Sequence, residues 1–401
     1  MAREILVSIY LMLFSFIFNI CKLFPQKKEK TVFVVTFIEN SASIYEELRR
    51  QDPSCRTIFL ASKNVYNFFS KYDESTILLF EPKKLKDFIV SIYHLATCKL
   101  VIVDNYYGFL SSIRFKKNVT CLQVWHASGA IKQFGLKDPS IVNRKSRAIT
   151  RFKKVYKQFH NIIVGSEEMA RIFGEAFGIE EKNILRTGMP RTDVFFKEKR
   201  IALIKKYMYQ KFPYLEEKKV ILYAPTFRDN ELDHFQLHLD LKEMQHHLNE
   251  DYIVLLRLHP AVKNNLDISK YEGFAYDFSK YAKLNDILFI TDILITDYSS
   301  IPFDFSILGK PMVFYPYDLE QYQKERGFWG EYSEVVPGPI AKSTGEIITI
   351  VQSENFQLEK VTEYKHNWNE YSQGTSSQNI ASWILYTLKS QETQKSSLYE
   401  T

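Results

Sequence analysis

The sequence predicts an α/β protein of two doubly wound domains, with a cleft between them and an apolar helix at the N-terminus. Two series of short apolar runs alternate with segments of helical spacing, and this alternation is typical of parallel sheets covered on both faces. A length of 401 residues is enough for two such domains. Ligands of doubly wound sheets bind beyond the carboxyl ends of the strands, so we expect the functional residues in the loops that follow the runs.

Residues 5–24 are almost wholly apolar, with the sequence ILVSIYLMLFSFIFNICKLF. A helix of this length could span a hydrocarbon core, or it could lie in the membrane interface. No small-x-small cleavage site follows, which argues against a cleaved signal peptide. Lys27, Lys28 and Lys30 come next, and lysines at this place indicate that the main body is cytoplasmic. We therefore predict a membrane-associated helix and basic linker over 1–30; the alternative is a helix buried in the core.

The first domain is predicted over residues 31–195. Its expected strands are residues 32–37, 57–61, 76–80, 100–103, 119–124 and 162–165. Helical spacing lies between them, for example over 44–50 and 83–96. A βαβ succession of this kind makes a parallel sheet.

The second domain is predicted over residues 196–385 and begins with a charged helical stretch at 197–211. Its expected strands are residues 220–224, 253–258, 293–296 and 312–315. The segment 292–315 reads as a strand, a turn, a helix and a second strand. In its turn Ser299 and Ser300 could cap the helix or bind a phosphate at its N-terminus, and the stretch alone favours neither explanation. Residues 386–401 are predicted to be a polar tail.

Composition limits the classes of partner. The formal net charge is +6 and the pI is about 8.8, which suits phosphates or anionic lipid. The basic residues are dispersed and form no nucleic-acid module, so we predict no nucleic-acid partner. No P-loop, Gly-x-Gly-x-x-Gly or His-Glu-x-x-His motif occurs, so we predict no cofactor and no metal site. The cysteines lack the spacing of a metal or redox pair, as expected of reduced structural residues: Cys21, Cys55, Cys98 and Cys121.

Chemically capable side chains collect after the predicted strands, in five clusters at 124–132, 188–193, 223–229, 256–260 and 292–315. Singly, such a histidine is more often a hydrogen-bonded structural residue, and such an arginine is more often an ion-pair partner. Together the clusters bring two histidines and three arginines to one expected cleft. Arginine matches phosphate geometry, and histidine is the usual general base near neutral pH. The set predicts transfer from a nucleotide-diphosphate donor.

These clusters also carry a family resemblance. The motifs are Trp-His-Ala-x-Gly-Ala-x-Lys-x-Phe-Gly at 125–135, Thr-Gly-x-Pro-Arg-Thr-Asp at 187–193, Tyr-Ala-Pro-Thr-Phe-Arg-Asp at 223–229, Arg-Leu-His-Pro at 257–260 and Thr-Asp-Tyr-Ser-Ser-x-x-Phe-Asp at 296–304. In this order they resemble the CDP-glycerol glycerophosphotransferase family of wall teichoic acid synthesis in Gram-positive bacteria. The resemblance covers roughly residues 30–385 and implies a GT-B fold, with two Rossmann-like domains around a cleft.

The first motif looks like the primase branch of that family. Primases transfer glycerol 3-phosphate from CDP-glycerol to the N-acetylmannosamine of an undecaprenyl-diphosphate-linked ManNAc-GlcNAc disaccharide and release CMP. The resemblance therefore implies these two substrates, the cytoplasmic leaflet of the cell membrane and other teichoic acid enzymes as partners. The alternatives are a glycerol- or ribitol-phosphate transferase or polymerase, and a non-catalytic membrane-bound scaffold that binds a nucleotide-sugar.

The resemblance also implies roles for single residues. His126 is the expected general base for the acceptor hydroxyl, and His259 with Arg257 is expected to neutralise the donor diphosphate. Ser299 and Ser300 are expected to bind phosphate. The remaining expected substrate-binding residues are Ala127, Ser128, Gly129, Ala130, Lys132, Arg191, Pro225, Thr226, Arg228 and Asp304, of which Asp304 is expected to meet a hydroxyl of the donor. A glycine-containing motif common in relatives is not evident at 36–43.

Overall fold

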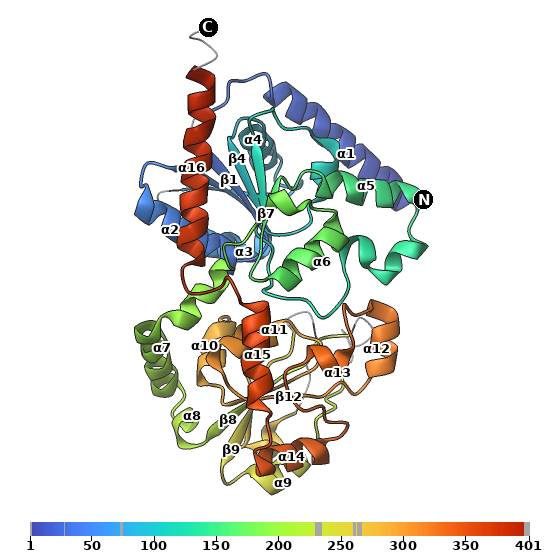
Figure 1. Cartoon of the computed structure of the whole chain (residues 1–401), viewed down its shortest axis with the longest axis vertical. Coiled ribbons are helices and arrows are strands. Elements are labelled where there is room, and N and C mark those ends of the chain that lie inside the picture. The colour runs from blue at the N-terminus through green and yellow to red at the C-terminus, as the bar shows by residue number, and fades with distance from the viewer. Residues whose placement is uncertain are drawn as a thin grey trace. The chain divides into compact units, whose positions relative to one another are not determined.

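The computed structural model describes residues 2–27, 29–72, 75–228, 235–259, 262 and 267–396. The chain folds into two compact units, which we describe separately (Figure 1). The first unit comprises Met1–Ala127, Phe134–Asp193 and Glu370–Thr401, and the second comprises Ser128–Gln133 and Val194–Asn369. The chain thus leaves the first unit directly after Ala127 and returns to it at Phe134.

Within the described residues, the first unit has a seven-stranded sheet in the order β3-β2-β1-β4-β5-β6-β7. Its strands are β1 (Lys30–Val35), β2 (Arg56–Ala61), β3 (Thr76–Leu79), β4 (Leu100–Val103), β5 (Thr120–Gln123), β6 (Asn161–Ile163) and β7 (Ile184–Leu185). Every neighbouring pair is parallel. The central strands β1 and β4 are buried along their whole length, which explains why they appear in the sequence as continuous apolar runs.

The helical segments of the first unit connect these strands. They are α1 (Ala2–Cys21), α2 (Glu39–Gln51), α3 (Lys63–Phe69), α4 (Leu85–Ala96), η1 (Gly108–Ser112), η2 (Gly135–Lys137), η3 (Pro139–Asn143), α5 (Ser146–Tyr156), α6 (Glu167–Phe177), η4 (Glu181–Asn183) and α16 (Ser376–Ser396). The segment η5 (Pro190–Phe196) contains the boundary between the units.

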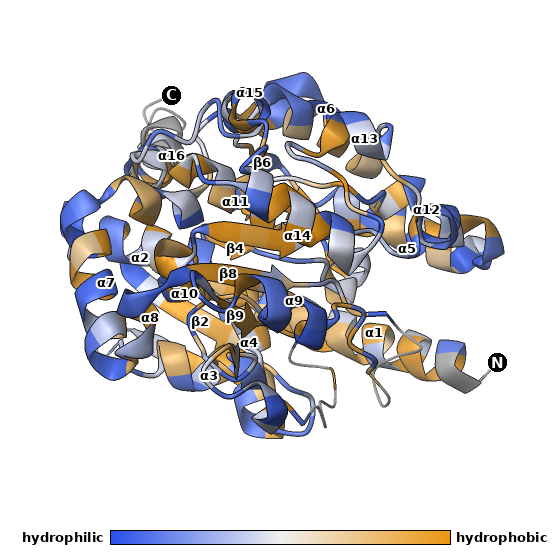
Figure 2. Cartoon of the chain, turned by 90° about the horizontal axis from the view of Figure 1, so that it is seen from below, coloured by the Kyte–Doolittle hydropathy of each residue, from blue (hydrophilic) through white to orange (hydrophobic). Residues whose placement is uncertain are grey.

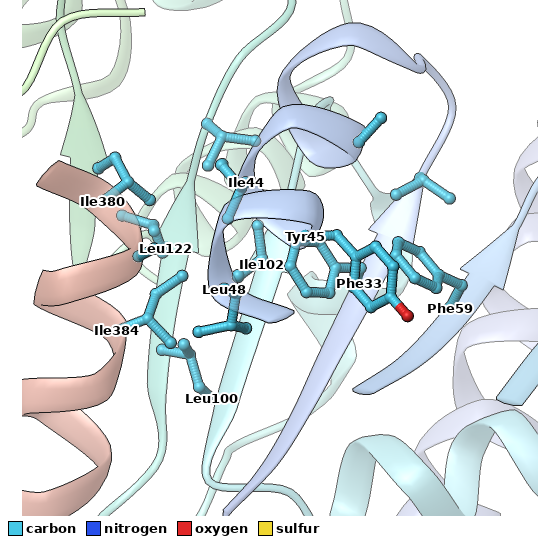
Figure 3. Close-up of a cluster of buried hydrophobic side chains, with 14 of the residues drawn as sticks. Phe33, Ile44, Tyr45, Leu48, Phe59, Leu100, Ile102, Leu122, Ile380 and Ile384 are labelled. Carbon is cyan, nitrogen blue, oxygen red and sulfur yellow. The ribbon is translucent and has the colours of Figure 1, made fainter. Parts of the chain in front are cut away.

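The C-terminal helix α16 corrects two predicted boundaries. Its residues Ile380 and Ile384 are fully buried and lie beside Leu122 and Leu100 of the first sheet (Figure 3). Residues from Glu370 on therefore belong to the first unit and not, as predicted for 370–385, to the second domain. The tail predicted over 386–401 is also wrong at its start, because α16 continues to Ser396 and Leu388 is buried. The sequence did not predict this, because the spacing of apolar residues indicates a helix but not the sheet against which the helix packs.

The second unit has a parallel sheet, with five strands among the described positions, in the order β10-β9-β8-β11-β12. The strands are β8 (Lys219–Ala224), β9 (Tyr252–Leu256), β10 (Ala275–Asp277), β11 (Ile293–Thr296) and β12 (Met312–Phe314). The helical segments are α7 (Glu198–Lys211), α8 (Tyr214–Glu217), α9 (Leu241–Leu248), η7 (Ser269–Tyr271), α10 (Leu284–Ile290), α11 (Ile301–Phe305), η8 (Ser306–Leu308), α12 (Leu319–Arg326), α13 (Tyr332–Val335), α14 (Thr344–Ser353) and α15 (Leu358–Trp368). Two doubly wound parallel sheets confirm the predicted fold class.

Helix α1 lies against the first unit along one side only. Phe14 and Phe18 are buried, and the Phe14 ring stacks on Phe109 with 4.9 Å between centroids. The opposite side is exposed and carries apolar residues: Ile5, Leu6, Ile9, Met12, Leu13, Phe16 and Ile20. Figure 2 colours much of this helix as hydrophobic. Among the described residues, only the stretch Glu4–Cys21 is a helix long and apolar enough to cross a membrane.

Candidate active site

His126 follows β5 in a strained turn of the first unit. The preceding residue, Trp125, has a positive φ of 51°, which is unusual for a residue other than glycine. Its backbone N–H donates to Gln123 Oε1 at 2.8 Å, and its ring stacks on Phe134 with 5.0 Å between centroids. These contacts hold the turn and so fix the position of the His126 backbone.

The His126 ring is held in one tautomer. Its Nδ1 lies 3.1 Å from the backbone carbonyl oxygen of Asp104, and a carbonyl oxygen can only accept, so Nδ1 carries the proton. Nε2 then has the free lone pair. The ring also stacks on Phe37, with centroids 4.3 Å apart and planes inclined by 13°. Burial lowers the pKa of His126 to about 4; the hydrogen bond to Asp104 opposes this and the charge of Arg191 adds to it. His126 is thus neutral near pH 7 and can accept a proton.

Asp104 supports this arrangement and was not predicted as a site residue. Its carboxylate accepts the backbone N–H groups of Thr36 and Phe37, both at 2.8 Å, and the Tyr107 hydroxyl at 2.6 Å. Burial raises the pKa of Asp104 to about 6, although these hydrogen bonds oppose the shift. The sequence signal was a carboxylate directly after the apolar run at 100–103. The loop that donates to this carboxylate, at 36–43, carries no family motif, so the sequence alone does not connect the two.

Arg191 belongs to the first unit and lies beside His126. Its guanidinium Nη1 donates to the His126 carbonyl oxygen, and its backbone N–H donates to Asn40 Oδ1 at 2.8 Å. Asn40 in turn donates to the carbonyl oxygens of Val124 and Trp125, at 2.9 and 3.1 Å. These bonds assign Arg191 to the support of the His126 turn. Ala127 is buried next to it.

The segment Ser128–Gln133 belongs to the second unit, where it pairs with the chain after α12. Gln133 donates its backbone N–H to the carbonyl of Gly327 at 3.0 Å, and Trp329 donates to Ile131 at 3.0 Å. A Cβ added at Gly129 would come within 2.3 Å of the Phe303 ring, so only glycine fits there. Packing therefore explains why residue 129 is a glycine.

Asp304 is buried and engaged by the protein. Its Oδ1 accepts the Ser128 hydroxyl at 2.5 Å, and the residue is 3% exposed. This bond ties the segment 128–133 to α11. We therefore assign Asp304 to the support of that segment instead of to contact with a donor hydroxyl.

Arg228 is the centre of a buried ion-pair network. Its Nε and Nη2 donate to the two carboxylate oxygens of Asp318, both at 2.7 Å, and its Nη2 lies 3.1 Å from Asp297 Oδ2. Its Nη1 donates to the carbonyl of Thr226. The guanidinium also stacks on the rings of Tyr298, Tyr317 and Tyr322. These contacts make Arg228 the residue that holds the loops after β8, β11 and β12 together.

Three basic side chains of the second unit are Arg257 and His259, which follow β9, and Lys132 on segment 128–133. Partial burial lowers the pKa of His259, and the charges of Lys132 and Arg257 add to the shift. The His259 ring lies 4.4 Å from that of Phe227 between centroids, while the residue as a whole is exposed. Burial lowers the pKa of Lys132 to about 8, and the carboxylate of Asp297 opposes the shift. Mutual repulsion of Lys132, Arg257 and His259 makes this a place that favours an anion.

Arg257 also organises a loop. Its Nη1 donates to three backbone carbonyls, those of Phe278 and Ser279 at 2.7 Å and of Tyr281 at 2.5 Å. The adjoining Pro260 and, after Arg228, Asp229 lie outside the described residues.

The turn after β11 leads into a short helix that begins at Ile301. Ser299 Oγ accepts the backbone N–H of Ile301 at 3.2 Å, whereas the Ser300 side chain makes no capping bond. The α-helix ends at Phe305 and continues as 3₁₀-helix to Gly309, whose φ of 66° closes it. Pro225 and Thr226 follow β8; Thr226 donates its backbone N–H to Asp297 at 2.8 Å, and its buried hydroxyl oxygen has no hydrogen-bond partner.

Comparison with known proteins identifies the family. A family model described as CDP-glycerol:poly(glycerophosphate) glycerophosphotransferase matches residues 16–386. The chain belongs to this family. It is 36% identical over 382 residues to the teichoic acid glycerol-phosphate primase of Bacillus subtilis, covering 95% of this chain and 98% of that protein. It is also 36% identical over 361 residues to the teichoic acid ribitol-phosphate primase of Bacillus spizizenii, covering 88% of each.

A solved structure supports the same assignment. The wall teichoic acid polymerase TagF superposes with a TM-score of 0.80 at 25% identity, covering 98% of this chain and 99% of the TagF chain. The GT-B fold predicted from the resemblance is thereby confirmed. In a glycerophosphotransferase a base must accept the proton of the acceptor hydroxyl, and cations must stabilise the phosphates. The first unit contains the neutral histidine His126, and the second contains the basic side chains of Lys132, Arg257 and His259.

Proposed function

We propose that this glycerophosphotransferase is a teichoic acid glycerol-phosphate primase. It transfers glycerol 3-phosphate from CDP-glycerol to the N-acetylmannosamine of an undecaprenyl-diphosphate-linked disaccharide and releases CMP. The observation that carries the proposed chemistry is the neutral His126, whose Nε2 keeps its lone pair because Nδ1 donates to Asp104. The similarity to a primase along nearly its whole length supports the choice of branch.

The reaction is an in-line displacement at phosphorus. The acceptor hydroxyl oxygen attacks the phosphorus that carries glycerol, the bond from that phosphorus to the CMP oxygen breaks, and CMP leaves with the bonding electrons. His126 Nε2 takes the hydroxyl proton. Lys132, Arg257 and His259 neutralise the charge that develops on the leaving phosphate, and Ser299 with Thr226 supplies hydroxyl donors to it. Pro225 and Ser300 complete the walls of this donor site.

CMP release tests the proposal. The full chain with CDP-glycerol and the lipid-linked disaccharide should release one CMP for each acceptor consumed, and the lipid product should gain a single glycerol phosphate. Without the acceptor, release should stop. Many CMP per acceptor would instead indicate a polymerase, and binding of CDP-glycerol without release under any acceptor would indicate a binding scaffold.

A ribitol-phosphate primase is the second candidate, because a protein of that name matches this chain at the same identity of 36%. The two candidates differ in the length of the polyol on the donor. Running the same assay with CDP-ribitol separates them: we expect a higher kcat/KM for CDP-glycerol, and the reverse order would select the ribitol enzyme.

The role of Lys132 predicts a pH dependence. Lys132 is charged below its pKa of about 8 and neutral above it, so a donor phosphate bound to it is held less well at high pH. The kcat/KM for CDP-glycerol should therefore fall by about tenfold per pH unit above that pKa. The variant Lys132→Arg stays charged and should lose this alkaline limb. An unchanged limb in Lys132→Arg would show that another group titrates.

We also propose that α1 holds the protein at the cytoplasmic leaflet while lying in the plane of the membrane interface. Both ends of the helical segment are tied to the first unit: Glu4 pairs with Arg151 at 3.0 Å, and Lys22 Nζ donates to the Arg114 carbonyl at 2.8 Å. A helix that spans the membrane would have to break these bonds to the first unit. A helix in the plane of the interface keeps them and buries only its exposed apolar side in lipid.

Substitution on that exposed side should release the protein from vesicles. Leu13 and Phe16 are 52% and 64% exposed, and each buried large apolar side chain contributes about 1.5–3 kcal/mol. Leu13→Ser with Phe16→Ser should weaken vesicle binding by about a hundredfold or more, as measured by flotation. The matched control is Leu203→Ser with Tyr207→Ser, on α7 of the second unit. Equal binding of the two double variants would contradict the assignment to α1.

A further inference from the structure

A cavity of about 240 Å³ opens beside the carboxyl ends of β1 and β2 in the first unit. It is lined by Tyr10, Val34, Val35, Thr36, Leu60, Ser62, Phe80, Tyr106, Tyr107, Gly108 and Phe109. Ligand sites of doubly wound sheets occur at this edge. Its volume is below the range of about 300–1,000 Å³ that is usual for drug-sized ligands, so it suits a single ring better than a nucleotide.

The lining has the chemistry of a saccharide site. Aromatic and aliphatic walls alternate with hydroxyl groups, and none of the lining residues is charged. One hydroxyl is unused: the Oγ atom of Ser62 is buried and has no hydrogen-bond partner. Ser62 precedes α3 but does not cap it with its side chain. A buried hydroxyl without a hydrogen bond lowers stability, and a ligand that hydrogen-bonds to it removes that cost. A neutral polyol has the groups to form such a bond.

The cavity shares its wall with the His126 turn. Thr36 lines the cavity, and its neighbour Phe37 stacks on the His126 ring at 4.3 Å. Tyr107 also lines the cavity. Its hydroxyl donates its one proton to the Asp104 carboxylate at 2.6 Å and therefore accepts from the Thr36 hydroxyl at 2.7 Å. A ring placed here therefore lies next to the groups that hold the base, on the side of the unit where Tyr10 of α1 closes the cavity.

We propose that this cavity binds a neutral N-acetylhexosamine ring of the acceptor. The inference rests on the proposed function and names the place where the acceptor saccharide is held. The ring packs on Phe80 and Phe109, and Ser62 Oγ hydrogen-bonds to one of its hydroxyl or amide groups. In the proposed function the exposed apolar side of α1 lies in the membrane interface, so the first unit is held where the lipid end of the acceptor is.

Two variants test the cavity with little risk to the fold. Ser62→Ala removes a hydroxyl that has no partner, and Gly108→Leu adds a side chain where a Cβ would meet only the Tyr106 ring, at 4.0 Å. The matched control is Gly174→Leu on α6, where the nearest atom to a Cβ lies 3.8 Å away and which is not among the residues that line this cavity. Circular dichroism melting should show that all three fold.

Steady-state kinetics should then show whether each variant affects binding of the acceptor or binding of the donor. We expect the acceptor KM to rise about two- to tenfold in Ser62→Ala and about tenfold or more in Gly108→Leu, with the CDP-glycerol KM unchanged. Gly174→Leu should match the wild type. If the wild type turns over and both cavity variants keep its acceptor KM, the cavity proposal is wrong and the proposed function stands.

Saturation-transfer NMR with a soluble N-acetylhexosamine disaccharide tests the cavity without turnover. Wild type and Gly174→Leu should transfer saturation to the saccharide, and Gly108→Leu should not. This result in a protein that releases no CMP would uphold the cavity and overturn the proposed function. No transfer from the wild type, or equal transfer from Gly108→Leu, would overturn the cavity.

Discussion

His126→Ala should lower kcat about 10²–10⁴-fold, because that is the usual contribution of a positioned general base. The KM for CDP-glycerol should change little, since His126 belongs to the first unit and the basic residues assigned to the donor belong to the second. Burial keeps the pKa of His126 near 4, so the base is already free of its proton over the neutral range. The wild-type rate should accordingly be flat from about pH 6 to 7.5, with no acidic limb from this group.

The matched control is His246→Ala, which removes an exposed histidine of α9. This variant should keep the wild-type rate. Rates are measured as CMP release at saturating donor and acceptor. A His126→Ala rate within threefold of the wild type would exclude His126 as the base and would leave its tautomer without a catalytic purpose.

Arg228→Met should destabilise the second unit by about 3–5 kcal/mol, the usual cost of removing one partner of a buried ion pair. Arg228 is 7% exposed, and its loss leaves the carboxylates of Asp297 and Asp318 without their countercharge. Stacking on three tyrosine rings is lost as well. Arg228→Lys keeps the charge but cannot donate to both carboxylate oxygens in one plane. Its free energy of unfolding should therefore lie between those of the wild type and Arg228→Met. Urea unfolding followed by circular dichroism measures the difference.

A second substitution identifies the cause. Adding Asp318→Asn to Arg228→Met removes one of the stranded charges and should recover part of the lost stability, whereas Asp318→Asn alone should destabilise. Strictly additive effects would show that the two side chains do not interact. A melting transition for Arg228→Met within about 2 °C of the wild type would contradict the ion-pair network.

The sequence predicted the sheets well because their strands are buried on both faces. Apolar runs such as 100–103 and 293–296 coincide with β4 and β11. The strands that escaped prediction are β7 and β10, which have two and three residues and lie at the sheet edges, where burial leaves no continuous apolar run. The predicted strand at 32–37 was too long: β1 ends at Val35, because Asp104 draws the next two backbone N–H groups out of the ladder.

Residue type located the candidate site but did not assign its parts. Rules for loops after strands selected His126, Lys132, Arg257 and His259. The same rules selected Arg228 and Asp304, which the structure shows in buried contacts with protein groups. Whether such a side chain bonds to the protein depends on a partner distant in the sequence. That partner is Asp318 for Arg228 and Ser128 for Asp304. No local pattern contains that information.

The most direct test of the account is to compare donor binding with transfer in two variants. The account assigns His126 to the acceptor and Lys132 to the donor. Calorimetric titration with CDP-glycerol should therefore give wild-type affinity for His126→Ala and weaker affinity for Lys132→Gln, while transfer falls in both. Loss of CDP-glycerol affinity in His126→Ala, with wild-type affinity in Lys132→Gln, would contradict this division of roles.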